Sequence, residues 1–166
     1  MSRPKSSTDV EQFLKRGGIP AEIVELPVEV HSVEAAARAV DVESTRIVKS
    51  VLFFVADKPV LALGNGVERI DRSAIALHFG VPVKLVRLAD REEVLAETGY
   101  EAGAVPPVGH VKPLTTVYDR GLRSHDVVYA GGGSNRTLLR IRVCDLMRSA
   151  GAVEMDLMTS PTKDLE

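Results

Sequence analysis

The residue best suited to chemistry is a lysine inside a strongly apolar stretch, IVKSVLFFVA at 47–56. β-Strand alternation places Lys49 on one face with four apolar residues, Ile47, Val51, Phe53 and Val55. An ammonium group loses hydration in such surroundings unless it finds a partner or reaches water. Lys49 therefore either extends its amine to solvent from a strand end or meets an anionic or carbonyl group in a pocket.

A second unusual stretch is ETGYEAGAVPPVGHVKP, residues 97–113, which is rich in glycine and proline and yet apolar. Ordinary surface connections are polar and run about four to six residues. Prolines fix a backbone, and glycines let it approach a small ligand closely. We therefore expect this segment to form a stiff pocket wall.

A third stretch, AGGGSNR at 130–136, follows the apolar segment DVVYA. A dinucleotide fingerprint would need a third glycine, where Arg136 stands, and then a helix, whereas TLLRIRV is strand-like. A Rossmann site is therefore excluded. The bare backbone N–H groups either approach a ligand or belong to a simple hairpin turn.

Other kinds of site find no support in the residue spacing. Cys144 is the one cysteine, on an expected helix face, and no G-x-S-x-G motif is present. The histidines do not have the spacing of metal ligands: His31, His78, His110 and His125. We expect neither a metal, nor a cofactor, nor a nucleophilic side chain.

The net charge of −2 excludes a strong overall field for polyanions. Residues 112–148, however, contain seven basic and three acidic residues. This excess of positive charge indicates either a site for a phosphate-bearing partner or scattered surface arginines. No N-terminal apolar run resembles a signal peptide or a membrane span, so we expect a cytoplasmic protein with no membrane contact.

The elements that position these residues indicate an α+β domain with a largely antiparallel sheet. We expect one domain over 1–166, with frayed tails at about 1–8 and 160–166. Helical spacing and caps predict short helices around Val10–Leu14, over 33–40, over 71–79, over 90–98 and over 143–150. Strands are expected at 22–26, 47–56, 59–64, 83–88, 115–119, 126–131 and 137–143.

Three features in order carry a family resemblance: VKS at 48–50, T-G-Y-x-x-G-x-x-x-P-x-G at 98–109, and YAGGGS leading into LLRIRVCDL. Together they resemble the YbaK/ProX-type aminoacyl-tRNA deacylases, free-standing relatives of the editing domain of bacterial prolyl-tRNA synthetases. The resemblance extends to about Met158. It implies a YbaK-like fold, a mixed and largely antiparallel sheet curled into a partial barrel and surrounded by short helices.

The resemblance also implies hydrolysis of the ester between a wrongly attached amino acid and the 3'-terminal adenosine of tRNA, without metal or cofactor. Lys49 matches the family's lysine, which positions the substrate's carbonyl or terminal phosphate. The loop at 103–109 would line the aminoacyl pocket, and the turn at 131–133 would close it. The implied substrate-binding residues are Leu26, Ser50, Gly103, Ala104, Val105, Pro107, Gly109, His110, Gly131, Gly132, Gly133 and Leu138.

Departures from the family pattern bear on the substrate. The cysteine-clearing subgroup has a tyrosine after the first strand, an aspartate after the glycine turn and a serine in that turn; here Leu26, Leu138 and Gly131 stand in these places. An apolar pocket favours a small uncharged amino acid, on tRNA(Pro) or a related tRNA. The alternatives are a noncatalytic tRNA-binding or synthetase-associated module and a hydrolase of small esters. A synthetase is the second implied partner, and monomer and homodimer both stay open.

Overall fold

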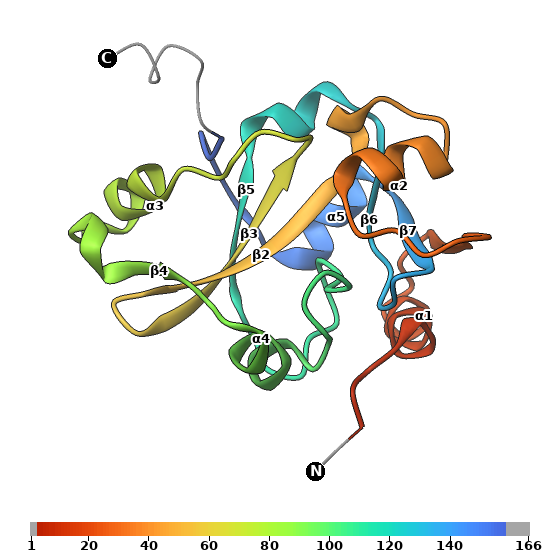
Figure 1. Ribbon diagram of the computed structural model, residues 1–166, viewed down its shortest axis with the longest axis horizontal. Coiled ribbons are helices and arrows are strands. Elements are labelled where there is room, and N and C mark those ends of the chain that lie inside the picture. Colours follow the sequence, from red (N-terminus) through yellow and green to blue (C-terminus); the bar gives the residue numbers. More distant parts are fainter. Residues whose placement is uncertain (1–2, 159–166) are drawn as a thin grey trace.

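The computed structural model describes residues 3–158, which form two β-sheets with five α-helices around them (Figure 1). The helices are α1 (Ser7–Arg16), α2 (Val33–Ala39), α3 (Arg72–Phe79), α4 (Arg91–Thr98) and α5 (Val143–Ala150). The strands are β1 (Ala21–Glu25), β2 (Val48–Val55), β3 (Lys58–Asn65), β4 (Val86–Leu88), β5 (Thr115–Asp119), β6 (Val127–Gly131), β7 (Thr137–Arg142) and β8 (Val153–Met155). Three 3-10 helices complete the order, η1 (Ser44–Arg46), η2 (Val83–Leu85) and η3 (Arg120–Ser124).

The larger sheet has the order β4-β2-β3-β5-β8, and the smaller one has the order β1-β7-β6. Only the β3–β5 and β5–β8 ladders are parallel among the described strands; the others are antiparallel. A parallel bridge between Ile47 and Tyr129 joins the two sheets at one edge. The predicted mixed, largely antiparallel fold is confirmed, with the sheets curled toward each other without closing.

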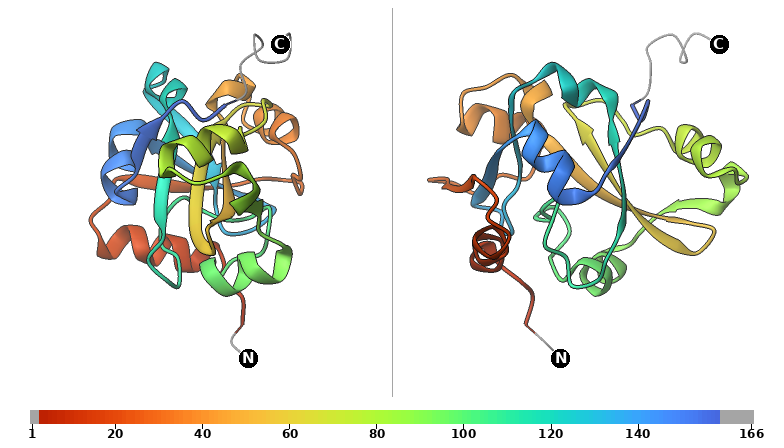
Figure 2. Two further views of the ribbon diagram at one scale, coloured as in Figure 1. Left: turned by 90° about the vertical axis from the view of Figure 1, so that its left-hand side faces the viewer. Right: turned by 180° about the vertical axis from the view of Figure 1, so that it is seen from behind.

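Three apolar clusters hold this arrangement together, and β2 contributes to two of them because its side chains alternate between faces. Leu52 and Phe54 belong to the main core, which α5 covers on the side away from α2 (Figure 2). Phe53 and Val55 belong to a second core beside α3. The third cluster lies beneath α2, which places α2 against the edge where the sheets meet.

The helix ends follow the local signals in the sequence. Ser32 caps α2 by accepting a hydrogen bond from the Ala35 N–H (3.0 Å). Asp90 and Glu93 form the predicted capping box of α4. Gly80 and Gly99 end α3 and α4 in the left-handed conformation.

One predicted strand needs correction, and one strand was missed. The first half of the predicted strand 83–88 is the 3-10 helix η2, capped by Pro82, so only residues 86–88 are extended. The short strand β8 was not expected.

The N-terminal tail is shorter than expected, since α1 begins at Ser7, inside the segment predicted to fray. The Ser6 N–H donates to the Asp9 carboxylate (2.8 Å) and fixes this helix start. Residues 160–166 lie outside the described part of the chain. No helix in 3–158 has the length and apolar character needed to cross a bilayer.

Candidate functional site

Lys49 lies in β2, partly buried, on the face predicted from strand alternation. Its amine donates a hydrogen bond to the backbone carbonyl of Glu68, in the connection between β3 and α3. The amine therefore has a carbonyl partner at an exposed position, which combines features of the two alternatives left open by the sequence. Burial lowers the pKa of Lys49, and the negative charges of Glu68 and Glu34 oppose part of that change.

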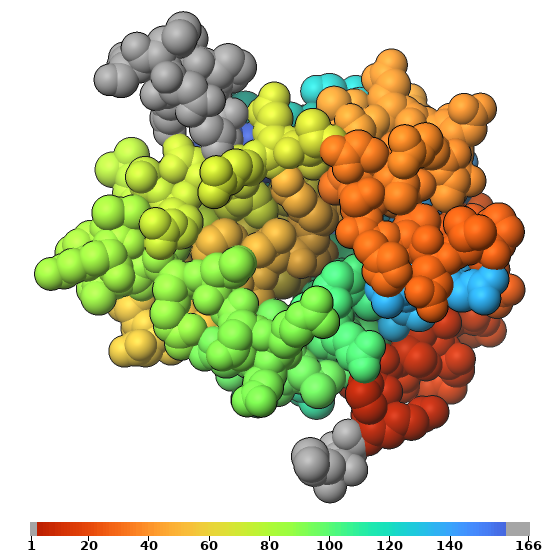
Figure 3. All heavy atoms as spheres, in the orientation of Figure 1, coloured from red at the N-terminus to blue at the C-terminus, as the bar shows by residue number. Residues whose placement is uncertain are grey.

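A groove of about 900 Å³ runs from Lys49 along the same face of β2. Val51 and Phe53 continue its floor, and the segment 68–73 forms one side. Val83 and Leu88 complete its lining. In Figure 3 the gold atoms of β2 and β3 lie at the bottom of a hollow, with the orange region of α2 on one side and the green-to-teal loop after α4 below. Apolar side chains of β2 therefore lead to the Lys49 amine, and the charged residues of 68–72 stand along one side.

The glycine turn packs directly on the backbone of the predicted pocket wall. The Gly133 N–H donates to the Ala104 carbonyl (3.0 Å). A Cβ at Gly131 would lie 2.2 Å from the Val105 carbonyl oxygen, so only glycine fits this position. A Cβ at Gly132 would lie 2.8 Å from the Thr137 carbonyl carbon. The turn and the loop were predicted to lie together, and they do.

The loop wall, residues 103–109 with the turn 131–133, is anchored by its flanking motif residues. Thr98 Oγ1 donates to the Val94 carbonyl (2.7 Å) and accepts from the Tyr100 N–H (3.0 Å). The Tyr100 side chain is fully buried in the main core. Thr98 and Tyr100 therefore hold the start of the loop, and residues 104–108 that follow Gly103 are buried.

Most of the loop wall is buried, including Ala104, Val105 and Pro107. Gly109 has a φ of +79°, and a Cβ there would lie 3.1 Å from the Phe13 ring of α1. The His110 Nε2–H donates to the Pro106 carbonyl (2.7 Å) and closes a tight turn. Burial lowers the pKa of His110, although this hydrogen bond acts in the opposite direction. The loop wall is thus fixed from both ends.

Leu26 and Leu138 lie in the same buried cluster, together with Ile47 and the inner face of α2. Leu138 pairs with Gly131 across the β6–β7 ladder. Ile47 bridges to Tyr129, and Lys49 and Gly131 each lie two residues beyond this bridge on the two strands. The structure therefore brings the leucines, the glycine turn and Lys49 to one edge between the sheets.

Of the predicted site residues, which all lie within 3–158, Lys49 alone lines the groove. Ser50 follows Lys49 in β2, so its side chain points to the opposite face, where its Oγ is buried with no hydrogen-bond partner among residues 3–158. Gly103 is exposed, with a φ of +89° and open space around its Cα. No residue of the loop wall lines the groove itself, which runs from Lys49 in the other direction.

The segment that partners Lys49 was not expected from the sequence. Glu68 contributes only its carbonyl oxygen to the amine, so its residue type gives no signal. Gly64 was an available signal, because a glycine within a strand often marks a close approach by another segment. It pairs directly with Lys49, and Ile70 and Met158 lie against it.

The basic segment 112–148 does not form the free positive patch that one alternative predicted. Arg123 and Arg120 pair with Glu154, and Arg142 and Arg148 both pair with Asp145. Lys112 and Arg140 also have carboxylate partners, and Arg136 donates to the Pro27 carbonyl (2.7 Å). Asp145 lies within the segment, whereas Glu22, Glu97 and Glu154 come from other parts of the sequence, so a count within the segment overstates its charge.

Comparison with known proteins places this geometry in a family. Residues 28–149 match the model of the aminoacyl-tRNA editing domain. A proline–tRNA ligase of Pseudothermotoga lettingae is 33% identical over 113 residues, which are 68% of this chain and 19% of the ligase. An uncharacterized Bacillus subtilis protein, YwhH, is 28% identical over 72% of this chain and 75% of its own length. The chain thus spans about a fifth of the ligase and most of YwhH.

The fold has a counterpart among solved structures. A crystal structure described as a candidate trans-editing enzyme for prolyl-tRNA synthetase superposes with a TM-score of 0.87 and 35% identity, covering 96% of this chain and all of the other. With the editing-domain model matched over most of the described residues, including Lys49 and both glycine-rich segments, this chain belongs to the aminoacyl-tRNA editing domain family.

Proposed function

We propose that this protein is an aminoacyl-tRNA deacylase that acts in trans in the cytoplasm, hydrolysing the ester between a mischarged amino acid and the 3' end of a tRNA. The observation that carries the proposal is Lys49, a partly desolvated amine that lines the groove and lies on the strand next to the Ile47–Tyr129 bridge between the sheets. The similarity to a candidate trans-editing enzyme over 96% of this chain and all of the other supports action as a separate protein.

The chemistry assigned to the site needs positioning rather than a nucleophilic side chain. A water oxygen attacks the ester carbonyl carbon, the carbon–oxygen bond to the ribose breaks, and the ribose oxygen takes up a proton. Lys49 would donate a hydrogen bond to the carbonyl or to the terminal phosphate. Backbone N–H groups of the loop wall would stabilise the negative charge that develops on the carbonyl oxygen. The neighbouring ribose hydroxyl is suited to assist the water.

The apolar surroundings favour a small uncharged amino acid as the part that is removed. Leu26 and Leu138 are both buried beside the glycine turn and offer no charged or hydrogen-bonding group. The proline–tRNA ligase relative supports tRNA(Pro) or a related tRNA as the carrier and a synthetase as a functional partner. A polar or charged amino acid would lose its hydration in this place without compensation.

The deciding experiment incubates the protein with alanyl-, cysteinyl- and seryl-tRNA(Pro) and measures the released amino acid. We expect accelerated hydrolysis of at least one of them, and a loss of roughly 10²-fold in Lys49→Ala, as for removal of one oriented donor. Lys58→Ala is the matched control, because Lys58 is exposed at the far end of the same β2–β3 hairpin.

Two outcomes contradict the deacylase. One is that no charged tRNA is hydrolysed faster than in buffer, and the other is full activity in Lys49→Ala. Tight tRNA binding with no release would identify a noncatalytic module instead. Cleavage of short aminoacyl esters as fast as intact aminoacyl-tRNA would identify a small-ester hydrolase.

A further inference from the structure

The last described segment, residues 155–158, crosses back over the site and contacts the connection that partners Lys49. Met158 forms an isolated antiparallel bridge with Ile70. The Asp71 N–H donates to the Leu157 carbonyl (2.8 Å). We call residues 155–158 the strap. It is hydrogen bonded to the same connection whose Glu68 carbonyl accepts from the Lys49 amine.

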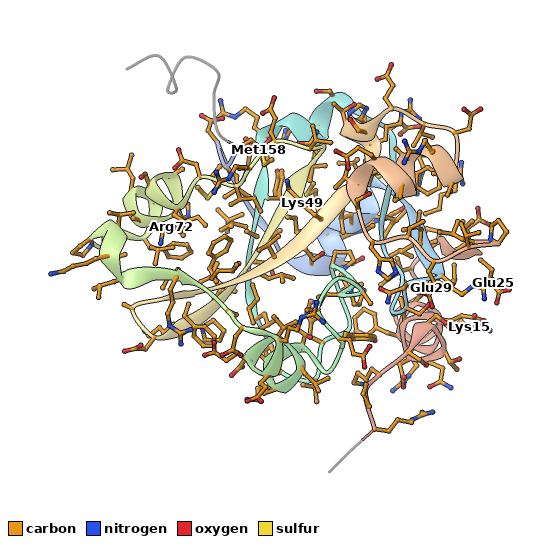
Figure 4. All side chains as sticks on the ribbon, viewed as in Figure 1. Lys15, Glu25, Glu29, Lys49, Arg72 and Met158 are labelled. Atoms are coloured by element: carbon orange, nitrogen blue, oxygen red, sulfur yellow. The ribbon has the colours of Figure 1, made fainter. Side chains whose placement is uncertain are left out.

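The strap reaches the sheet because β3 has a glycine directly opposite Lys49. Lys49 and Gly64 are paired across the β2–β3 ladder, and directly paired residues point to the same face. A Cβ at Gly64 would lie 2.8 Å from Met158 Sδ and 3.1 Å from Ile70 Cγ1. Met158 therefore fills the place that a side chain at position 64 would have beside Lys49, as the labelled residues in Figure 4 help to show.

The buried carboxylate of Asp119 accepts hydrogen bonds from the backbone of the strap and fixes its position. Asp119, at the end of β5, is 9% exposed, and its Oδ1 accepts from the N–H groups of Leu157 (2.9 Å) and Met158 (3.3 Å). Its Oδ2 accepts from the Gly121 N–H (2.8 Å). The Leu157 side chain is fully buried in the second core. The position of Met158 is thus set by the backbone of Ile70 and Asp71 on one side and by the Asp119 carboxylate on the other.

We propose that Met158 is a positioning residue for Lys49. Seated against Gly64, its side chain limits water around the lysine, and the strap holds Ile70 and Asp71 so that the Glu68 carbonyl stays in reach of the amine. The effect of this positioning on catalysis rests on the proposed deacylase function. The positioning itself is a property of the folded chain and is measured without any substrate.

The surroundings of the amine give the direction of the expected effect. Glu68 and Glu34 act on Lys49 with negative charge, and Arg69, Asp71 and Arg72 line the adjoining groove. Burial is the main cause that lowers the pKa of Lys49. Removing the Met158 side chain admits water and leaves these charges in place, so the pKa of Lys49 should rise toward the ordinary lysine value.

The test is an NMR titration of the lysine amines after reductive methylation with ¹³C-formaldehyde, with the Lys49 signal assigned by its absence in Lys49→Arg. We expect a higher Lys49 pKa in Met158→Ala and a value near that of the wild type in Met158→Leu, which refills the space. Gly64→Ala is a second route, because its new methyl group pushes Met158 away and should raise the same pKa.

Met155→Ala is the matched control. It removes the same type of side chain from the same segment, but Met155 packs in the second core, so it should lower the melting temperature and leave the Lys49 pKa unchanged. An unchanged Lys49 pKa in both Met158→Ala and Gly64→Ala would overturn the proposal.

Deacylation kinetics give the second readout. With an active substrate we expect kcat to fall by up to roughly 10²-fold in Met158→Ala, with KM little changed, as for a misplaced reacting group. The high-pH limb of the activity profile should move to higher pH with the Lys49 pKa. If no tRNA is hydrolysed by the wild type, the titration still decides the positioning role, so the two proposals fail separately.

Discussion

The two sides of the Lys49 site are built in opposite ways. The loop wall is backbone packed on backbone, with Gly131 against the Val105 carbonyl and Gly133 bonded to Ala104. The opposite side, formed by residues 68–71 and the strap, has few backbone contacts, the Asp71–Leu157 hydrogen bond and the Ile70–Met158 bridge, and depends on the Asp119 carboxylate and the packing of Met158. We refer to it as the strap wall.

This difference affects how each wall responds to change. A wall of close backbone contacts has no side chain that can move aside, so a single added methyl group displaces the main chain. A wall held by side chains loses one contact at a time and tolerates smaller replacements. We therefore expect single substitutions in the loop wall to cause large losses of stability and deacylation. Substitutions in the strap wall should cause smaller losses that depend on the contact removed.

The largest effect is expected for Gly131→Ala. The added Cβ would lie 2.2 Å from the Val105 carbonyl oxygen, and relief requires movement of the backbone of the loop or of β6. We expect a loss of about 3 kcal/mol in the free energy of unfolding, at the upper end for overpacking, together with loss of deacylation. Urea denaturation and the mischarged-tRNA assay measure the two.

Gly103→Ala is the matched control within the same wall. Gly103 has a φ of +89° but nothing within 4 Å of its Cβ position, so alanine meets strain without a clash. A cost of about 1 kcal/mol is expected. Equal losses at the two glycines would show that backbone conformation, and not close packing, governs the loop wall.

An intermediate effect is expected for Asp119→Ala. The change leaves the N–H groups of Gly121, Leu157 and Met158 without their acceptor and should lower the free energy of unfolding by about 2 kcal/mol. Asp156→Ala removes the same charge from an exposed site of the strap and should change it by less than about 0.5 kcal/mol. Similar losses in the two variants would contradict the strap wall as described.

The smallest effect concerns pH and the His110 turn of the loop wall. The pKa of His110 is below 6.5 in the folded chain, so the unfolded chain takes up a proton first as the pH falls. Its stabilising contribution is complete above pH 6.5 and is lost as the pH falls through the folded value. Urea midpoints at pH 7 and pH 5 should therefore differ less in His110→Gln, which can still donate to Pro106. An equal difference in variant and wild type would show that His110 is not responsible.

The loop wall could be predicted from the sequence and the strap wall could not, for a physical reason. Close backbone packing demands glycine and proline, and these residue types are visible in the composition of 97–113 and 130–136. Glu68 and Asp71 act in the strap wall through their backbone groups, which every residue has. Only Gly64, inside an apolar strand, could have pointed to a crossing segment.

The difference between local and distant contacts also explains which helix ends, strand pairings and ion pairs could be predicted. Helix ends set by neighbours, such as Ser32 and the Asp90–Glu93 box, were predictable because their partners lie within three residues. The parallel β3–β5–β8 pairing depends on long-range packing, and it could not be found from local periodicity. The ion pairs that neutralise the basic segment also join distant positions, such as Arg140 with Glu22.

The seat of the strap on Gly64 has a consequence for the order of assembly. β2 and β3 form a local hairpin early in synthesis, with Lys49 already in its register, whereas the strap is the last described segment to leave the ribosome. Until then Met158 does not pack beside Lys49 on the hairpin. The connection at 68–71 also lacks its contacts with Leu157 and Met158. The environment of the amine is thus completed only when the strap reaches the β2–β3 hairpin and the connection after it, which makes the surroundings of Lys49 depend on the last step of folding of the described residues.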